Sequence, residues 1–197
     1  MRVYAMNISG IDAEDKRWYA YLSERRAEKV KRLKHAQKKA QSIGAELLLN
    51  YAVKLETDAK TPVNWDTDEN GKLYLTDYDN IYVNLSHSGD YAVCAVNDKP
   101  VGADIQRCRE CDMKTAERFF TADEAEFIAQ SQDKNSAFFE IWTKKESFVK
   151  AIGRGITIPL NSFSVLSDSV EYDGAVYLFK EYTVSRAGYK LFVCRQS

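Results

Sequence analysis

A helical region followed by several short strands occurs twice along this chain, and this repeated order limits the possible folds more than any other feature. After an alternating strand at residues 2–8, the spacing of apolar residues predicts helices over residues 12–54, in two or more pieces. Short β-rich pieces follow from residue 61, and the helical pattern returns over residues 113–152 before further strands. This order favours an α+β fold over one continuous parallel sheet.

The predicted strands are short and are separated by turn signals. Asn70 and Gly71 predict a hairpin between residues 63–65 and 72–75. The strongest helix covers residues 136–152 and ends at Gly153 and Gly155. Further extended pieces are predicted at residues 81–86, 91–96, 103–106, 162–166, 176–179, 182–184 and 189–194.

A weak internal echo supports a division into two similar halves. GDYAVC at residues 89–94 and GYKLFVC at residues 188–194 each come late in a helix-then-strands order. We therefore predict halves at residues 1–102 and 103–197, each a helix packed on a small antiparallel sheet. No linker or low-complexity segment separates them, so they should share an interface.

Charge and apolar content restrict the partners and the compartment. Lys and Arg total 28 against 29 for Asp and Glu, so no overall field attracts nucleic acid or an anionic membrane. No apolar run suits a signal peptide or a membrane span, and we expect a cytoplasmic protein. Cys108 and Cys111 have a spacing that suits metals, but nearby ligands are lacking, so reduced thiols are favoured.

Residues 25–39 concentrate positive charge locally. The eight basic side chains are Arg25, Arg26, Lys29, Lys31, Arg32, Lys34, Lys38 and Lys39. A solvated helix face is the usual explanation of such a run, and a phosphate-binding stripe is the alternative.

The strongest helix carries polar residues that suit chemistry. Trp142, Glu146 and Lys150 recur at intervals of four and so share one helical face. A Glu–Lys salt bridge beside a core tryptophan would explain the spacing equally well. Asp104, close to Gly102 at a strand end, offers a second carboxylate, and Asp and Glu from separate elements are typical ligands of magnesium on a phosphorylated substrate.

The sequence SHSG at residues 86–89 places a histidine in a glycine-containing turn. Ser86 and His87 are neighbours on a strand and point opposite ways, which argues against nucleophilic serine chemistry. His87 can instead donate to a phosphate. Thr121 followed by Glu124 has the spacing of a helix capping box.

Four segments resemble, in order and spacing, the signature segments of Sfp-type phosphopantetheinyl transferases: VNLSHSGDYAVCAV, VGADIQ, RFFTADE and IWTKKESFVKAIGRGITIPLNSFSV. The resemblance covers residues 83–165. It implies a pseudo-twofold pair of α+β halves with coenzyme A in the cleft between them. It also implies magnesium-dependent transfer of phosphopantetheine from coenzyme A to a serine of an acyl or peptidyl carrier protein, with release of adenosine bisphosphate.

The resemblance implies that the second half carries the metal-binding and catalytic motifs. Asp104 and Glu146 look like the magnesium ligands, and Gln106 stands where the family usually has a third acid. Glu146 would also be the general base for the carrier serine. Lys150 would neutralise or protonate the departing phosphate.

Further roles implied by the resemblance concern coenzyme A itself. His87 would hold a phosphate oxygen, with Ser86 nearby. Arg26 and Lys29 align with basic residues near the ribose phosphate, and Lys72 with the lysine of the family's GKP segment.

The chain departs from the family pattern at three places besides these matches. Leu73 replaces the proline of the GKP segment, Gln41 replaces an arginine near the adenine, and Gln106 is neutral. Glu124 lies at a family acidic position, and this role and the helix cap stay equally open.

Two other functions compete with the enzyme. A module of this fold that binds coenzyme A or a carrier protein without turnover is supported only by Gln106. A nucleic-acid binder using residues 25–39 conflicts with the balanced total charge. We expect a monomer, and the pathway served (fatty-acid, polyketide or nonribosomal peptide, including antibiotic biosynthesis) stays open.

Overall fold

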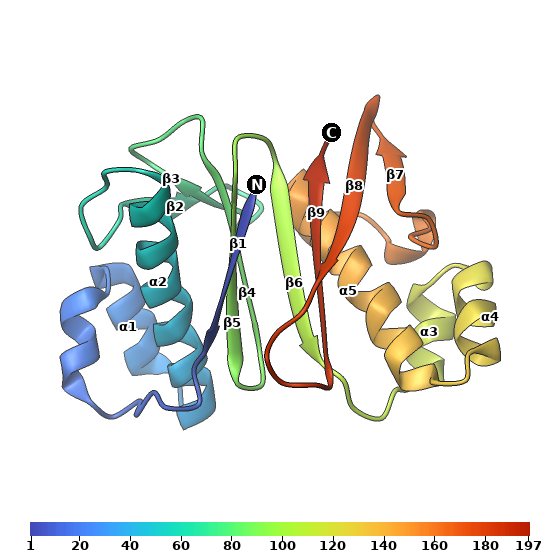
Figure 1. Cartoon of the computed structure of the whole chain (residues 1–197), viewed down its shortest axis with the longest axis horizontal. Helices are drawn as coiled ribbons and strands as arrows, with labels where there is room; N and C mark the ends of the chain where they lie inside the picture. Colours follow the sequence, from blue (N-terminus) through green and yellow to red (C-terminus); the bar gives the residue numbers. More distant parts are fainter.

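The chain forms two α+β halves that lie side by side (Figure 1). The computed structural model describes residues 1–155 and 157–197 completely and residue 156 by its backbone alone. The first half contains β1 (Arg2–Asn7), the 3-10 helix η1 (Lys16–Tyr21), α1 (Glu24–Arg32), α2 (Ala36–Glu56), β2 (Trp65–Thr67), β3 (Leu73–Leu75), β4 (Tyr82–Ser88) and β5 (Tyr91–Asn97). The second contains β6 (Val101–Arg107), α3 (Met113–Phe119), α4 (Ala122–Gln130), α5 (Lys134–Ile152), the 3-10 helices η2 (Gly155–Thr157) and η3 (Leu160–Ser162), β7 (Ser169–Tyr172), β8 (Ala175–Tyr182) and β9 (Tyr189–Gln196).

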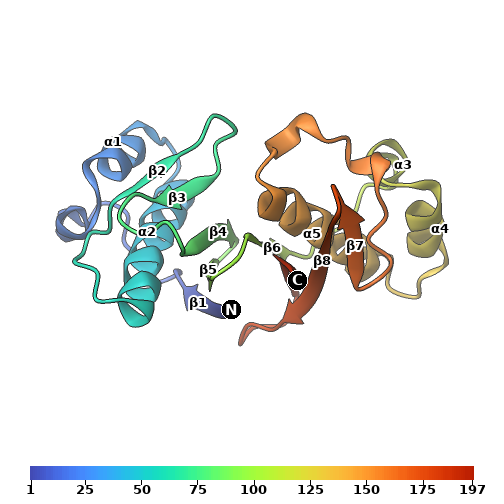
Figure 2. The same cartoon turned by 90° about the horizontal axis from the view of Figure 1, so that it is seen from above.

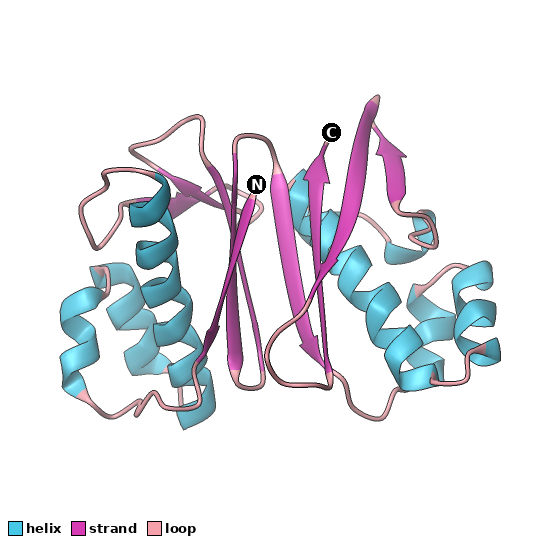
Figure 3. Cartoon of the chain, in the orientation of Figure 1, coloured by secondary structure: helices cyan, strands magenta, loops and turns pink.

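Each half packs helices on an antiparallel sheet, as the sequence predicts, and the first half also contains the separate two-stranded sheet β2-β3. The strand order is β1-β5-β4 in the first sheet and β6-β9-β8-β7 in the second. Helix α2 packs on the first sheet and α5 on the second, on the outer sides of the molecule (Figures 2 and 3). The division at residues 102 and 103 stays a prediction.

The hairpin predicted at Asn70 and Gly71 is present, since β2 pairs with β3 and Gly71 has a φ of 82°. Its first strand covers residues 65–67, however, and not the predicted residues 63–65. No helix among the described residues is long and apolar enough to cross a bilayer.

The region at residues 12–54 is helical in pieces, and its first α-helix begins only at Glu24.

Two predicted strands are wrong. Residues 162–166 form no strand, because the Leu160 and Phe163 carbonyls accept hydrogen bonds from the buried Lys145 ammonium instead of from a neighbouring strand. Residues 182–184 are not a separate strand either, since Tyr182 ends β8. Strand β7 is not among the predicted strands, although Asp173 begins an Asp-Gly turn with positive φ at both residues.

Side chains, in place of backbone pairs, join the two sheets where β4 lies beside β6. Alternate β4 side chains accept hydrogen bonds from alternate β6 amides: Asn84 Oδ1 from Ala103 at 2.9 Å, Ser86 Oγ from Ile105 at 3.2 Å, and Ser88 Oγ from Arg107 at 3.0 Å. We call these contacts the β4–β6 seam. The seam sets the position of one half relative to the other.

Gly102 lets α5 lie directly against β6. A Cβ atom at this position would lie 2.0 Å from the carbonyl oxygen of Ser147 and 2.3 Å from the amide nitrogen of Ala151. Only glycine permits this approach. The contact brings the face of α5 that carries Glu146 and Lys150 next to Asp104 on β6.

Glu124 satisfies the predicted capping box and also forms a buried ion pair. It accepts from the Thr121 amide, and the Thr121 hydroxyl accepts from the Glu124 amide. Its carboxylate also lies 2.8 Å from Lys145 Nζ, and both side chains are fully buried. A further bond from the Val165 amide ties the segment after α5 to α4.

Candidate active site

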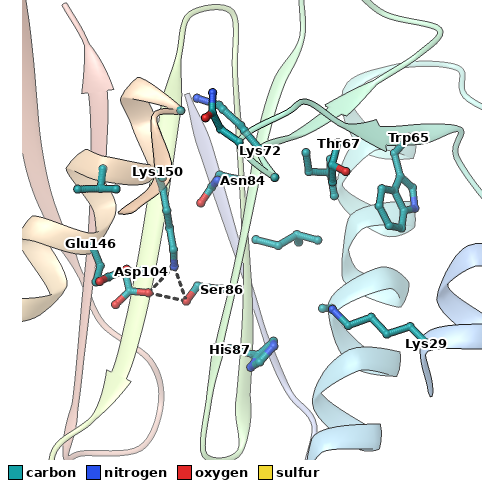
Figure 4. A pocket seen from close by; sticks show the side chains of 18 of the residues that line it. Lys29, Trp65, Thr67, Lys72, Asn84, Ser86, His87, Asp104, Glu146 and Lys150 are labelled. Carbon is teal, nitrogen blue, oxygen red and sulfur yellow. Dashed lines mark hydrogen bonds and ion pairs between the residues drawn. The ribbon is translucent and has the colours of Figure 1, made fainter. Parts of the chain in front are cut away.

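A cavity of about 1110 Å³ lies between the halves (Figure 4). Its walls come from α1, the β2–β3 hairpin and β4 on one side, and from β6, α5, Gly153, Gly155 and residues 158–160 on the other. Pockets for ordinary small ligands measure roughly 300–1000 Å³. The cavity therefore suits a large ligand that contacts both halves.

Asp104 lies at the centre of the polar network in this cavity. It is only 2% exposed, and both of its carboxylate oxygens accept hydrogen bonds. Lys150 Nζ lies 2.5 Å and Ser86 Oγ 2.8 Å from Oδ1, and Gln106 Nε2 lies 2.9 Å from Oδ2. The seam between the halves and the centre of the cavity thus share Ser86.

Glu146 supplies a second carboxylate one helical turn before Lys150 (Figure 4). Burial raises the pKa of Glu146, and the neighbouring charge of Asp104 raises it further, while Lys150 opposes this. Two carboxylates that repel each other across a cavity fit a bound cation. No three His, Cys, Asp or Glu side chains of the fully described residues gather as a metal site, so a cation here would need additional oxygens from an amide, water or ligand.

Ser86 and His87 point in opposite directions, as their neighbouring positions on β4 require. Ser86 is buried, whereas His87 is exposed in the cavity. The enclosed surroundings, with the charges of Lys38 and Lys150, lower the pKa of His87 to about 4. The imidazole is therefore neutral near pH 7 and offers one N–H donor to a ligand.

Binding of a phosphorylated ligand is expected to raise the pKa of His87 by about one pH unit or more, because a nearby anion favours the imidazolium. The measurement is an NMR titration of the imidazole with and without coenzyme A, with a His35→Gln variant for assignment. A pKa of His87 that does not change on adding coenzyme A would place the phosphates elsewhere.

Lys72 crosses the cavity from the first half to the second. Its ammonium nitrogen lies 2.5 Å from the carbonyl oxygen of Ala151, near the C-terminus of α5. Burial lowers the pKa of Lys72 to about 8, and the nearby carboxylate of Asp68 partly counteracts this. A ligand phosphate would have to compete with the Ala151 carbonyl for this ammonium.

Arg26 and Lys29 line the same wall but differ in their partners. Arg26 is 7% exposed, and its Nε donates to the fully buried Glu46 at 2.8 Å. Lys29 is exposed in the cavity. Partial enclosure of its ammonium by the cavity walls, with the charges of Arg26 and Arg25, lowers the pKa of Lys29. Lys29 is thus the more available cation for a phosphate.

We expect Lys29→Met to weaken coenzyme A binding about tenfold or more, since a charge-assisted hydrogen bond is worth about 1.5–3 kcal/mol. Calorimetric titration with coenzyme A measures this. Lys31→Met is the matched control, because Lys31 lies on the same helix and its own side chain does not line the cavity. Equal affinities for the two variants would contradict the assignment.

The two other departures from the family pattern lie at or near this wall. Gln41 is 4% exposed and donates to the Gly89 carbonyl at 3.1 Å, while its Oε1 has no partner among the described residues. Leu73, on β3, lines the cavity. Neither side chain supplies a positive charge.

Sequence reasoning missed Trp65 as a cavity residue. Its indole lies in β2, with the guanidinium carbons of Arg25 and Arg26 at 5.1 and 5.0 Å from the ring centroid. The sequence feature that could have indicated Trp65 is a tryptophan in a short predicted hairpin strand, in the same half as a basic helix. Phe119 and residues 158–160, which line the opposite wall, also gave no recognised signal.

The sequence is similar to known phosphopantetheinyl transferases. The family model of the 4'-phosphopantetheinyl transferase superfamily matches residues 100–194. The chain is 30% identical to the 4'-phosphopantetheinyl transferase Sfp of Bacillus subtilis (strain 168) over 194 residues, covering 92% of this chain and 85% of that protein. Another 4'-phosphopantetheinyl transferase of Bacillus subtilis is 34% identical over 190 residues, again covering 92% of this chain and 85% of that protein. The 4'-phosphopantetheinyl transferase gsp of Aneurinibacillus migulanus is 42% identical over 124 residues, 61% of this chain and 51% of that protein.

These similarities extend well beyond the resemblance at residues 83–165 and include both halves of the fold. The family implies coenzyme A as the substrate. The chain therefore belongs to the Sfp-type 4'-phosphopantetheinyl transferases, enzymes that transfer phosphopantetheine to carrier proteins.

Proposed function

We propose that the cavity between the halves binds coenzyme A together with Mg²⁺ and transfers its phosphopantetheine to a serine of an acyl or peptidyl carrier protein. The observation that carries this proposal is the convergence of Asp104, Glu146 and Lys150 on one cavity from β6 and α5. The cavity volume of about 1110 Å³ and the positive charges on the opposite wall suit a nucleotide diphosphate ester.

Asp104 and Glu146 would hold the cation, with the carbonyl oxygen of Gln106 as a third candidate ligand. Hard oxygen donors of this kind match the preference of Mg²⁺, which is commonly bound by one or two carboxylates plus substrate phosphates. When bound, the cation would neutralise charge on the diphosphate.

Glu146 would accept the proton of the carrier serine as its oxygen attacks the β-phosphorus, the phosphorus that carries the pantetheine. Its raised pKa brings the base nearer to neutral pH. The new bond joins serine oxygen to phosphorus, and the bond to the adenosine bisphosphate breaks. Lys150 would neutralise or protonate the departing phosphate oxygen, while His87 and Lys29 hold the nucleotide phosphates and Lys72 contacts the nucleotide.

Intact-mass measurement tests this function. The protein is incubated with coenzyme A, Mg²⁺ and apo carriers from fatty-acid, polyketide and nonribosomal peptide systems. A mass gain of one phosphopantetheine group on a carrier is the expected result, and the carrier that reacts fastest identifies the preferred class. Binding of coenzyme A with no mass gain on any carrier would favour the binding module that Gln106 alone supports.

A nucleic-acid function is tested by titrating duplex DNA at increasing salt. A protein that binds DNA through residues 25–39 would show an affinity that falls steeply with salt. We expect no such salt-dependent DNA binding. The monomeric state and the cytoplasmic location stay predictions, which gel filtration and cell fractionation check.

A further inference from the structure

A hydrogen bond to Asp104 fixes the orientation of the Gln106 side-chain amide. This orientation determines which atom of the amide is available to a ligand in the cavity. Gln106 Nε2 donates to Asp104 Oδ2 at 2.9 Å. An ionised carboxylate only accepts hydrogen bonds, so the amide nitrogen must face Asp104 and the carbonyl oxygen must face another way. Gln106 lines the cavity, so it contributes a neutral oxygen and no charge.

The remaining charges of the site largely cancel. The ammonium of Lys150 lies 2.5 Å from Asp104 Oδ1, and this contact offsets the negative charge of Asp104. Ser86 and Gln106 occupy further positions on the same carboxylate. Glu146 is the only carboxylate of this group without an ion pair among the described residues. A divalent ion entering the ligand-free site would meet about one net negative charge, because Asp104 is already offset.

We propose that Gln106 makes cation binding depend on coenzyme A, so that the ion is held weakly by the free protein and tightly only together with the diphosphate. This inference rests on the proposed function and names how its site is regulated. The diphosphate adds the negative charge and the oxygen ligands that the protein lacks. It also gives the Lys150 ammonium a second negatively charged partner besides Asp104. The cation and coenzyme A therefore enter as a pair.

A glutamate at position 106 would behave differently. It could not donate to Asp104, and it would place a third carboxylate beside Asp104 and Glu146. Such a cluster is unfavourable without a cation and attracts one strongly. Gln106→Glu should thus convert the conditional site into one that binds the ion alone.

The experiment uses the full chain and Mn²⁺ as the probe. Free Mn²⁺ is measured by its electron paramagnetic resonance signal, without carrier protein so that no turnover occurs. Titrations are run with and without saturating coenzyme A, with Mn²⁺ bound to coenzyme A alone subtracted. The wild-type protein should bind Mn²⁺ at least about tenfold more tightly with coenzyme A, and Gln106→Glu should tighten binding without coenzyme A by about tenfold or more.

Two variants control the assignment. Gln132→Glu introduces the same charge at an exposed position outside the cavity and should leave both Mn²⁺ affinities unchanged. Asp104→Asn should weaken Mn²⁺ binding in the presence of coenzyme A, which places the ion at this site. Thermal unfolding of each variant shows that it is folded.

Equal Mn²⁺ affinities of the wild-type protein with and without coenzyme A would overturn the inference, whatever the variants do. An unchanged coenzyme A-free affinity in folded Gln106→Glu would also overturn it. If carriers are modified while either result is found, the inference alone fails. If Mn²⁺ binding depends on coenzyme A but no carrier gains mass, the transfer step of the proposed function fails, while the joint binding of the cation and coenzyme A, on which the inference rests, stands.

Discussion

Replacing Glu146 by glutamine is expected to lower the kcat of phosphopantetheine transfer by about 10²- to 10⁴-fold, the usual contribution of a general base. Glutamine keeps the shape of the side chain and an oxygen for the cation, but it cannot accept the serine proton. The measurement is the initial rate of carrier modification at saturating coenzyme A and Mg²⁺.

The pH profile separates the base from a simple cation ligand. Burial and Asp104 raise the pKa of Glu146, whereas a bound cation lowers it. We therefore expect an acid limb in the wild-type profile, where activity falls as the pH drops and Glu146 takes up a proton. This limb should disappear in Glu146→Gln. Glu140→Gln is the matched control on the same helix, since Glu140 pairs with Lys144 and Lys190 outside the cavity. Near wild-type activity of Glu146→Gln, with Mn²⁺ still bound, would disprove the assignment.

Replacing Lys145 by methionine is expected to lower the free energy of unfolding by about 3–5 kcal/mol, because it leaves a buried carboxylate without its counter-charge. Lys145 lies 2.8 Å from Glu124, and its ammonium donates to the Leu160 and Phe163 carbonyls at 2.7 and 2.6 Å. Both charged side chains are fully buried. Urea unfolding monitored by tryptophan fluorescence measures the loss.

A double variant tests the origin of this loss. Lys145→Met combined with Glu124→Met removes both charges and should regain part of the stability, since no uncompensated charge is left. Lys134→Met, at an exposed position on the same helix, should change stability by less than about 0.5 kcal/mol. A Lys145→Met protein as stable as the Lys134→Met control would show that the pair contributes little.

Features that depend on local geometry could be predicted from the sequence. The end of α5 at Gly153 follows from a residue that adopts a φ of 71° without strain. The opposite directions of Ser86 and His87 follow from strand alternation alone. The capping box at Thr121 is a matter of spacing over three residues.

Features that depend on distant partners could not be predicted. The basic run gave no reason to separate Arg26 from Lys29, because the buried Glu46 that holds Arg26 lies on another helix. The sequence of residues 162–166 has a strand-like pattern. It does not show that the Lys145 ammonium, which is distant in sequence, donates hydrogen bonds to carbonyls of this region. The convergence of Asp104 and Glu146 in one cavity likewise depends on the contact that Gly102 permits.

The β4–β6 seam links the contact between the halves to the polar centre of the cavity. A backbone ladder between strands resists separation at every residue, whereas the seam is held by rotatable side chains of Asn84, Ser86 and Ser88. A rotamer change in Ser86 would remove two contacts at once, the bond from the Ile105 amide and the bond to Asp104. Occupancy of the cavity beside Asp104 is therefore linked through one hydroxyl to the polar contact between the halves.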